Sequence, residues 1–326
     1  MSQQLDRARG SLAGLAIGDA LGRPVEGMSY QDIRAKYGAI DDFVNLEPAG
    51  SDDTEYALLT AAALLQHGKN ITAADFANVW KSKVCTQTAA FLGAGFSEMN
   101  AIQNLKVGLM PPFSGQHNHA WSDGLAMRVA PIGVIANGDI EMAKRIAIAD
   151  GEVSHSGEGI YSGIAIAVAV TSGMAGKSYL EVYSDALNSV PKDSWTYRTL
   201  VDAQNILNEN ASATLFENAE RLLEKVAQTK YFFADLAPEA VSLALASVLY
   251  GKGDFAKSLL FAVNLGRDAD TIAAMAGAVA GSISGYKNIP DKWKVAVTSV
   301  GGSCLAFTKG MEPLSIADSL VEMGSK

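Results

Sequence analysis

The chain has 326 residues, of which 48% are hydrophobic and 19% charged, a balance typical of a globular protein with a sizeable core. Its net charge of −9 argues against binding to nucleic acid or to an anionic membrane surface, because both need clustered Lys and Arg. Two cysteines far apart, Cys85 and Cys304, give no disulfide framework and suit a reducing compartment. The first residues, Met1 to Arg7, lack the pattern of a secretory signal, so we expect a cytoplasmic protein.

Helical patterns dominate the chain, because segments rich in Ala and Leu recur with apolar residues at helical spacing. The first predicted helix covers 6–21, and the second covers 54–67 and ends before Gly68, a residue suited to a helix C-terminus. Several of the others begin after a Ser, Thr, Asp or Asn, as helix caps require. Those further helices are predicted over 72–81, 122–134, 140–148, 160–171, 178–188, 215–228, 237–249, 255–264, 271–283 and 316–323.

Strand patterns are weak, and the best candidate is the short segment 43–46. The longest apolar stretch, 159–175, is interrupted by polar residues and glycines, so it predicts a buried helix and not a membrane span. No fixed-period repeat and no Pro/Ser/Gly-rich linker divides the chain. The sequence therefore predicts an all-α bundle of many helices.

A first candidate metal-ligand motif, Ser51-Asp52-Asp53, stands at the start of a predicted helix. Adjacent carboxylates repel each other, and the positive end of a helix or a shared cation reduces that cost. Carboxylate and hydroxyl oxygens are hard ligands, which Mg²⁺, Ca²⁺ and Mn²⁺ prefer. The alternative is a helix cap with extra acidic residues, since Ser and Asp are preferred capping residues.

A second motif of the same kind, Asp268-Ala269-Asp270-Thr271, enters a helix rich in Ala and Gly. Capping is again the alternative. Taken together, the two motifs offer four carboxylates and two hydroxyls, enough for two hard cations, as in two-metal hydrolytic sites. Without a cation, four buried carboxylates would shift their pKa values strongly. If both motifs form one site, residues 1–326 fold as a single domain whose first and last thirds are in contact.

Three further segments are candidates for chemistry. Glu26, in the loop after the first helix, can position a water or exchange a proton, or it is a solvated loop residue. Ser122-Asp123-Gly124, before a predicted helix, is expected to leave backbone N–H groups free for a phosphate, or it is a simple cap. His155 can contact a ribose or phosphate, although a lone His is more often a packed residue.

In their order along the chain, these segments resemble the ADP-ribosylglycohydrolase family. The matching pieces are GSLAGLAIGDALG at 10–22, SDDTE at 51–55, SDGLAMRVAPIG at 122–133, SHSGEG at 154–159 and NLGRDADT at 264–271. The resemblance implies an orthogonal bundle of many helices with two Mg²⁺ ions in a central cleft, with Mn²⁺ as the alternative ion. It also implies a ribosyl or ADP-ribosyl substrate, carried on a modified protein or on a small compound.

The resemblance implies roles for individual residues as well. Glu26 falls at the position of the family's catalytic or water-positioning glutamate, and Asp53 and Asp270 are expected to take part in catalysis. The loop Ser122 to Gly124 matches the one that wraps the phosphates and ribose of the ligand, and His155 matches a histidine at the edge of the pocket. The expected metal ligands are Ser51, Asp52, Asp53, Asp268, Asp270 and Thr271.

The implied reaction is metal-dependent hydrolysis of an N- or O-glycosidic bond at a ribose, through an oxocarbenium-like transition state. The sequence departs from the family pattern at Ser51, usually Thr, at Arg267, often Gly, and at Asp123, usually Asn. An acid beside a pyrophosphate is unfavourable, so Asp123 favours a smaller ribosyl ligand such as a nucleoside. The sequence also leaves open a non-catalytic, crystallin-like or binding member of the family, and an unrelated helical protein.

Overall fold

The structure is a computed structural model that describes residues 1–45, 47–209, 213–228 and 233–324. Those residues contain fifteen α-helices and no strand, only two isolated bridges that pair Ser29 with Gly266 and Ser122 with Leu236. The predicted all-α class is therefore confirmed. The strand predicted at 43–46 is wrong for Phe43 to Asn45, which form bends and extended loop, and Leu46 lies outside the described residues.

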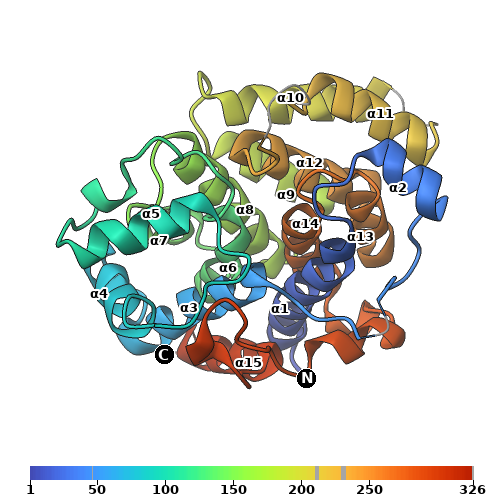
Figure 1. Cartoon of the computed structure of the whole chain (residues 1–326). Coiled ribbons are helices and arrows are strands. Elements are labelled where there is room, and N and C mark those ends of the chain that lie inside the picture. The colour runs from blue at the N-terminus through green and yellow to red at the C-terminus, as the bar shows by residue number, and fades with distance from the viewer. Residues whose placement is uncertain (46, 210–212, 229–232, 325–326) are drawn as a thin grey trace.

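The helices follow one another through the whole chain and are numbered in that order (Figure 1). Their bounds in the first half are α1 Gln3–Gly22, α2 Tyr30–Tyr37, α3 Asp52–His67, α4 Ala73–Lys83, α5 Phe96–Lys106, α6 Ala130–Ala136, α7 Ile140–Gly151 and α8 Glu158–Met174. In the second half they are α9 Tyr179–Asn188, α10 Trp195–Glu209, α11 Leu215–Lys225, α12 Ala237–Tyr250, α13 Phe255–Val263, α14 Ala269–Ser284 and α15 Pro313–Gly324.

Most predicted helices are found within a few residues of their predicted bounds. The helix predicted over 122–134 is wrong in its first half, where a 3-10 turn at Ala126–Arg128 precedes α6, and Pro131 occupies the first turn of α6. Three helices were not predicted: α2, which is short and polar, α5 and α10. Helix α5 packs against α4, and α10 packs against α11 and α12. Helix α2 contacts the ring of Phe216, from α11, through Tyr30. Such tertiary contacts supply most of the stability of helices in proteins.

Helices α1 and α14 lie side by side in the middle of the molecule, and their backbones touch (Figure 1). A Cβ atom added to Gly14 would lie 2.1 Å from the carbonyl oxygen of Gly277, and one added to Gly10 would lie 2.3 Å from that of Gly281. Only glycine permits this approach. The contact places the C-terminal end of α1 beside the first turn of α14, so the first and last thirds of the chain meet there.

The segment after α14 returns to cover α1 and α3. The buried carboxylate of Glu55, in the first turn of α3, accepts hydrogen bonds from the backbone N–H groups of Ser303, Cys304 and Leu305 at 2.8, 3.0 and 2.6 Å. None of the helices in the described part of the chain is both long and apolar enough to cross a membrane. The apolar stretch 159–175 is instead almost the whole of α8, which is buried in the protein.

Candidate metal site

The first turn of α3 is held in place by Asp19, near the C-terminal end of α1. The Asp19 carboxylate accepts hydrogen bonds from the N–H and hydroxyl of Ser51, at 2.7 and 2.8 Å, and from the N–H and hydroxyl of Thr54, at 3.1 and 2.5 Å. The Asp19 carboxylate thus fills the role of the acceptor that a capping side chain normally supplies at a helix N-terminus. Asp52 and Asp53 are therefore free to extend from the helix without serving as caps.

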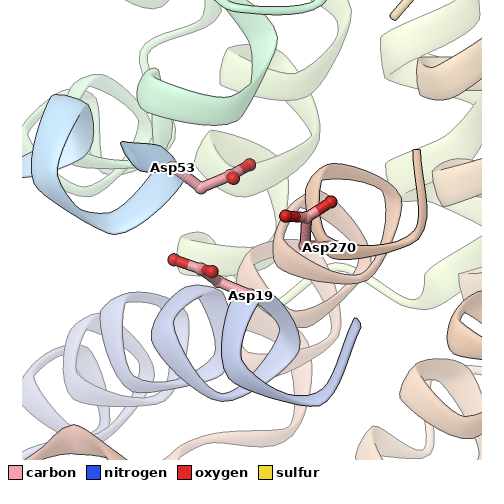
Figure 2. A group of neighbouring side chains, drawn as sticks. All are labelled: Asp19, Asp53 and Asp270. Atoms are coloured by element: carbon pink, nitrogen blue, oxygen red, sulfur yellow. The ribbon is translucent and has the colours of Figure 1, made fainter. Parts of the chain in front are cut away.

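Asp19, Asp53 and Asp270 point toward one another from α1, α3 and α14 (Figure 2). One carboxylate oxygen from each lies within 4.8 Å of the others. Glu26, Asp268 and Asp270 form a second group, whose carboxylate oxygens also lie within 4.8 Å of one another. Asp270 belongs to both groups, so the structure brings together the two acidic motifs that lie far apart in the sequence.

Two carboxylate oxygens in this arrangement have no partner. Oδ1 of Asp53 and Oδ1 of Asp270 are buried and accept no hydrogen bond within the described residues. Asp19 differs, because its oxygens are already engaged by Ser51 and Thr54, so its role is to position α3. A buried acceptor without a partner costs free energy, and a hard cation is the group that several facing carboxylates can share. The residues present therefore fit a metal ion.

The electrostatics of the carboxylates agree with this geometry. Burial, and then the negative charges of Asp19 and Asp52, raise the pKa of Asp53 well above its usual range. Burial and the charges of Asp53 and Asp268 do the same to the pKa of Asp270. Burial is also the largest cause that raises the pKa of Asp268 to about 6. Each carboxylate is thus held in a site that disfavours its charged form until a positive charge is supplied.

The acidic residues line one cavity of about 340 Å³. Among the described residues of its wall the one cation is Arg267, and this guanidinium is already paired with the buried carboxylate of Glu239 at 2.6 Å. Arg267 therefore neither points freely to solvent nor neutralises the cavity. The eight acidic residues that line it are Glu26, Asp52, Asp53, Glu98, Asp123, Asp235, Asp268 and Asp270, and Thr271 lies beside them.

Ser122, Asp123 and Gly124 also line this cavity, but the loop differs from expectation. The backbone N–H of Asp123 donates to the carbonyl oxygen of Asp235 at 3.0 Å, so it is not free to hold a phosphate. Oδ2 of Asp123 is buried without a partner in the described part of the chain, and burial, followed by the charges of Asp268 and Asp235, raises the pKa of Asp123 well above its usual range. A carboxyl in this environment favours its neutral form, which resembles an asparagine side chain in shape.

Glu98, from α5, is a residue of the site that the sequence did not indicate. Its carboxylate is buried and lies 3.4 Å from Nη1 of Arg128, which is itself buried and paired with Asp150 at 3.0 Å. A Cβ atom added to Gly124 would lie 2.1 Å from Oε1 of Glu98, so only glycine leaves room for this carboxylate. The one available indication was Arg128 itself, since a guanidinium within an apolar segment requires buried carboxylates nearby.

The remaining expected residues lie at different depths. Glu26 is exposed at the rim, and burial of part of its side chain raises its pKa. His155 is buried behind Ser122 and is absent from the described residues that line the cavity, so it does not stand at the edge of the pocket as expected. A second cavity of about 260 Å³ adjoins the first and shares Ser122 and Asp235 with it. Its wall includes Trp121 and Trp195.

Comparison with known proteins identifies the family to which this site belongs. A family model described as ADP-ribosylglycohydrolase matches residues 1–324. The chain belongs to the ADP-ribosylglycohydrolase family. The resemblance seen in the sequence is thereby confirmed, and the family is one of hydrolases that act on ADP-ribose linkages.

Several ADP-ribosylglycohydrolase relatives are similar over most of the chain. An uncharacterized protein of Archaeoglobus fulgidus is 33% identical over 298 residues, which cover 88% of this chain and 90% of that protein. The ADP-ribosylarginine hydrolase Tri1 of Pseudomonas putida is 27% identical and matches 89% of this chain and 74% of its own. The human ADP-ribosylhydrolase ARH3 is 25% identical, and the match covers 90% of this chain and 89% of ARH3.

A solved structure described as an ADP-ribosylglycohydrolase-related protein complex has the same fold. It superposes with a TM-score of 0.69 at 22% sequence identity and covers 99% of this chain and 100% of its own. At that identity the likeness establishes the fold alone. The all-α architecture described above is thus the fold of the ADP-ribosylglycohydrolase family.

Proposed function

We propose that this protein is a Mg²⁺-dependent hydrolase that removes an ADP-ribosyl group from a protein or a small compound, by cleaving an N- or O-glycosidic bond, and that residues 1–326 form one catalytic domain. The observation that carries the proposal is a pair of buried oxygens, one on Asp53 and one on Asp270, that accept no hydrogen bond from the described residues. Both side chains line a cavity with eight acidic residues in the described part of its wall. Family membership supplies the reaction class.

The two acidic motifs are the proposed ligands of two Mg²⁺ ions, with Mn²⁺ as the alternative. Hydroxyl and carboxylate oxygens are the donors that these hard cations prefer. A bound cation supplies the positive charge that lets the carboxylates ionise and that polarises a water or a ribose hydroxyl. Asp19 holds the first motif in place through Ser51 and Thr54. The ligands are Ser51, Asp52, Asp53, Asp268, Asp270 and Thr271.

Glu26 is the proposed base. It lies within 4.8 Å of Asp268 and Asp270, at the rim where water enters, and burial raises its pKa toward the range useful for proton transfer. In the reaction, the oxygen of a water forms a bond to the anomeric carbon while the bond from that carbon to the leaving group breaks. The proton released by the water passes to the Glu26 carboxylate, and the leaving group takes up a proton from Glu26 or from solvent.

The two adjoining cavities suit the two ends of an ADP-ribosyl group. The acid-lined cavity accommodates the ribose next to the metal ligands, and the neighbouring one, with Trp121 and Trp195 in its wall, suits a planar base. A neutral Asp123 carboxyl removes the repulsion of a nearby pyrophosphate, because its pKa is raised by burial. This favours an ADP-ribosyl ligand over the smaller nucleoside that Asp123 suggested from the sequence.

The proposal is tested by incubating the protein with ADP-ribosylated arginine, ADP-ribosylated serine and a panel of nucleosides, each with Mg²⁺ and with EDTA. We expect release of ADP-ribose from at least one ADP-ribosylated substrate with Mg²⁺, and loss of that activity in EDTA. Release of ribose from nucleosides alone would support the smaller-ligand alternative. Activity that is equal in EDTA and Mg²⁺ would contradict the metal dependence.

A further inference from the structure

We propose that a one-way chain of hydrogen bonds, from the guanidinium of Arg128 to the carbonyl oxygen of His119, turns the hydroxyl of Ser122 into a hydrogen-bond acceptor for the ligand. Ser122 would then recognise a hydroxyl of the ribose and could not donate to a phosphate oxygen. The direction of the chain follows from the structure alone, whereas the identity of the ligand rests on the proposed function.

The chain begins with a group that can only donate. Arg128 is fully buried, and its Nη2 lies 2.8 Å from Oγ of Ser154. That same Oγ lies 2.8 Å from Nδ1 of His155. Because the Ser154 hydroxyl receives a hydrogen bond from Arg128, its single proton is left for the imidazole. Nδ1 of His155 is therefore an acceptor.

The chain ends with a group that can only accept. The Ser97 hydroxyl donates to the carbonyl oxygen of His119 at 2.7 Å, and this uses its single proton. Oγ of Ser122 lies 2.5 Å from Oγ of Ser97. Since Ser97 has no proton left to donate, the Ser122 hydroxyl is the donor of that contact. The proton of Ser122 is thus turned away from the ligand.

The contacts on the two sides of His155 assign the same tautomer to its imidazole. Nε2 of His155 lies 3.0 Å from Oγ of Ser122, whose own proton is committed to Ser97, so Nε2 must carry the proton and donate it. A neutral imidazole with its proton on Nε2 is also what the acceptor role of Nδ1 requires. Burial and the positive charge of Arg128 hold the pKa of His155 well below its usual range. The Glu98 carboxylate, 3.8 Å from Nε2, lies beyond hydrogen-bond distance and is paired with Arg128.

The Ser122 hydroxyl then has one lone pair left and no proton to offer. Ser122 lines both the acid-lined cavity and its neighbour, so a ligand that crosses from one to the other passes this side chain. The adjacent N–H of Asp123 is also committed, to Asp235. A phosphate oxygen needs donors, whereas a ribose hydroxyl can donate. Ser97, Ser154, His155 and Arg128 are positioning residues in this account.

The direction of the chain is tested by NMR without any substrate. In the full-length protein labelled with ¹⁵N-histidine, we expect His155 to be neutral at pH 7, with Nε2 protonated and Nδ1 unprotonated. Its signal is identified by elimination with the variants His67→Gln, His117→Gln and His119→Gln. A proton on Nδ1, or a charged imidazole, would overturn the proposal.

The ligand class is tested by calorimetric binding of ADP-ribose and of analogues that lack the 2- or the 3-hydroxyl of the terminal ribose. Loss of one of these hydroxyls should weaken binding to the wild type about fivefold more than binding to Ser122→Ala, the effect of one neutral hydrogen bond. Ser122→Thr, which keeps the hydroxyl, should behave as the wild type. Ser114→Ala, a buried serine whose hydroxyl has no hydrogen-bond partner among the described residues, is the matched control.

In Ser97→Ala the Ser122 hydroxyl loses the acceptor of its proton and can donate that proton to the ligand. The difference in affinity between ADP-ribose and the sensitive analogue should therefore become smaller. Equal losses in wild type and Ser122→Ala for both analogues would overturn the assignment of Ser122 as an acceptor. Failure of the wild type to bind ADP-ribose would contradict the proposed function and the ribose assignment. The NMR experiment would still decide the direction of the chain, so the two failures are distinguishable.

Discussion

One carboxylate oxygen of Asp53 and one of Asp270 are buried from solvent. Neither accepts a hydrogen bond from any of the described residues. Neither is placed to stabilise the fold by itself, because like charges surround both. Most buried polar atoms in proteins are satisfied, so two such atoms at one point indicate a ligand that completes them. The buried carboxylates should therefore lower the free energy of unfolding of the metal-free protein, and this loss can be measured.

Replacement of Asp53 by Asn should stabilise the protein in EDTA and abolish its response to Mg²⁺. The amide removes an ionisable group whose charged form is disfavoured by burial and by the charges of Asp19 and Asp52, so we expect the free energy of unfolding to rise by about 1–3 kcal/mol. Thermal unfolding with EDTA and with Mg²⁺ measures both effects. Asp291→Asn, whose side chain is 96% exposed, is the control and should change neither. A Mg²⁺ response that survives in Asp53→Asn would contradict the ligand assignment.

The stability of the metal-free protein should fall as the pH rises through the acid range. Burial raises the pKa of Asp268 to about 6 and raises the pKa values of Asp53 and Asp270 well above their usual range, so the folded state binds more protons than the unfolded state above pH 4. The unfolding midpoint in EDTA should therefore be higher at pH 5 than at pH 7. With saturating Mg²⁺ the carboxylates ionise, and the trend should flatten or reverse. Identical pH profiles in the two conditions would argue against metal binding here.

Replacement of Asp123 by Asn should leave the affinity for ADP-ribose intact at low pH and extend it to higher pH. The raised pKa of Asp123, caused first by burial, keeps the carboxyl neutral below that pKa, and ionisation above it would repel the pyrophosphate. Calorimetric titrations across the pH range compare the two proteins. A wild-type affinity that does not fall with pH more than that of Asp123→Asn would remove Asp123 from the ligand contacts.

Among the helices, α1 and α14 determine the geometry of the site, because their backbones touch and each carries one of the facing carboxylates. Asp19 lies beside the first turn of α3, and Asp270 lies near the carboxylates of both Asp19 and Asp53. The remaining helices pack around this pair (Figure 1). A change in the distance between α1 and α14 therefore moves the carboxylates relative to one another.

Replacement of Gly14 by Ala should destabilise the protein by at least about 3 kcal/mol, although Ala favours helices by about 1 kcal/mol. The new Cβ would lie 2.1 Å from the carbonyl oxygen of Gly277, and a backbone cannot yield as a side chain can. Urea denaturation measures the change. Gly301→Ala, where nothing lies within 4 Å of the new atom, is the matched control and should stay within about 0.5 kcal/mol. A wild-type midpoint for Gly14→Ala would show that the helices separate easily.

The sequence allowed prediction of the elements whose signals are local. The starts of α3 and α14 were predictable because capping residues and paired acids stand together in each. The role of Asp19 was not, since its partners Ser51 and Thr54 belong to another helix. Its one local indication was a carboxylate inside the apolar second half of α1. Glu98 was not predictable for the same reason, because its partner Arg128 comes from a separate segment.

The direction of the Ser122 hydroxyl also lay beyond sequence reasoning. A serine before a helix can accept or donate, and only the contacts of Ser97 and His155 decide which. Of the N–H groups that this loop was expected to leave free, that of Asp123 donates to the carbonyl oxygen of Asp235, next to the bridge between Ser122 and Leu236. Patterns along the chain thus indicated that the two acidic motifs meet, whereas the packing determines which hydrogen bonds each residue donates or accepts.

Across the whole molecule, the last segment of the chain is fastened to the helix that carries the first acidic motif. Glu55 follows Asp53 by two residues in α3. Its carboxylate accepts hydrogen bonds from the three backbone N–H groups of residues 303–305. A charged acceptor for three buried donors is a strong contact. The C-terminal segment therefore contributes to the rigidity of the turn that carries the proposed metal ligands, although residues 303–305 do not line the cavity.

Replacement of Glu55 by Gln should lower the free energy of unfolding by about 2–3 kcal/mol, because one amide oxygen cannot satisfy three donors that a carboxylate satisfied. Hydrogen exchange should increase first at the N–H groups of Ser303 to Leu305. The affinity for Mg²⁺ should fall as well, as the turn that holds Asp53 loosens. Glu141→Gln, at a side chain that is 82% exposed, is the control. Unchanged exchange in 303–305 would refute the fastening role.

The glycine contact between α1 and α14 has a consequence for ion selection. Where backbones already touch, the spacing of the two helices is set by the size of peptide atoms, as firmly as a cross-link would set it. The proposed metal ligands stand at the start of α14 and at the start of α3, which Asp19 of α1 holds in place, so their oxygens would have little freedom to move apart. Mg²⁺ holds its oxygens at about 2.1 Å and Ca²⁺ at about 2.3–2.6 Å. Binding of Ca²⁺ at the proposed site would therefore require the aspartate side chains to rotate, so we expect the glycine contact, although it is remote from the ligands, to favour Mg²⁺.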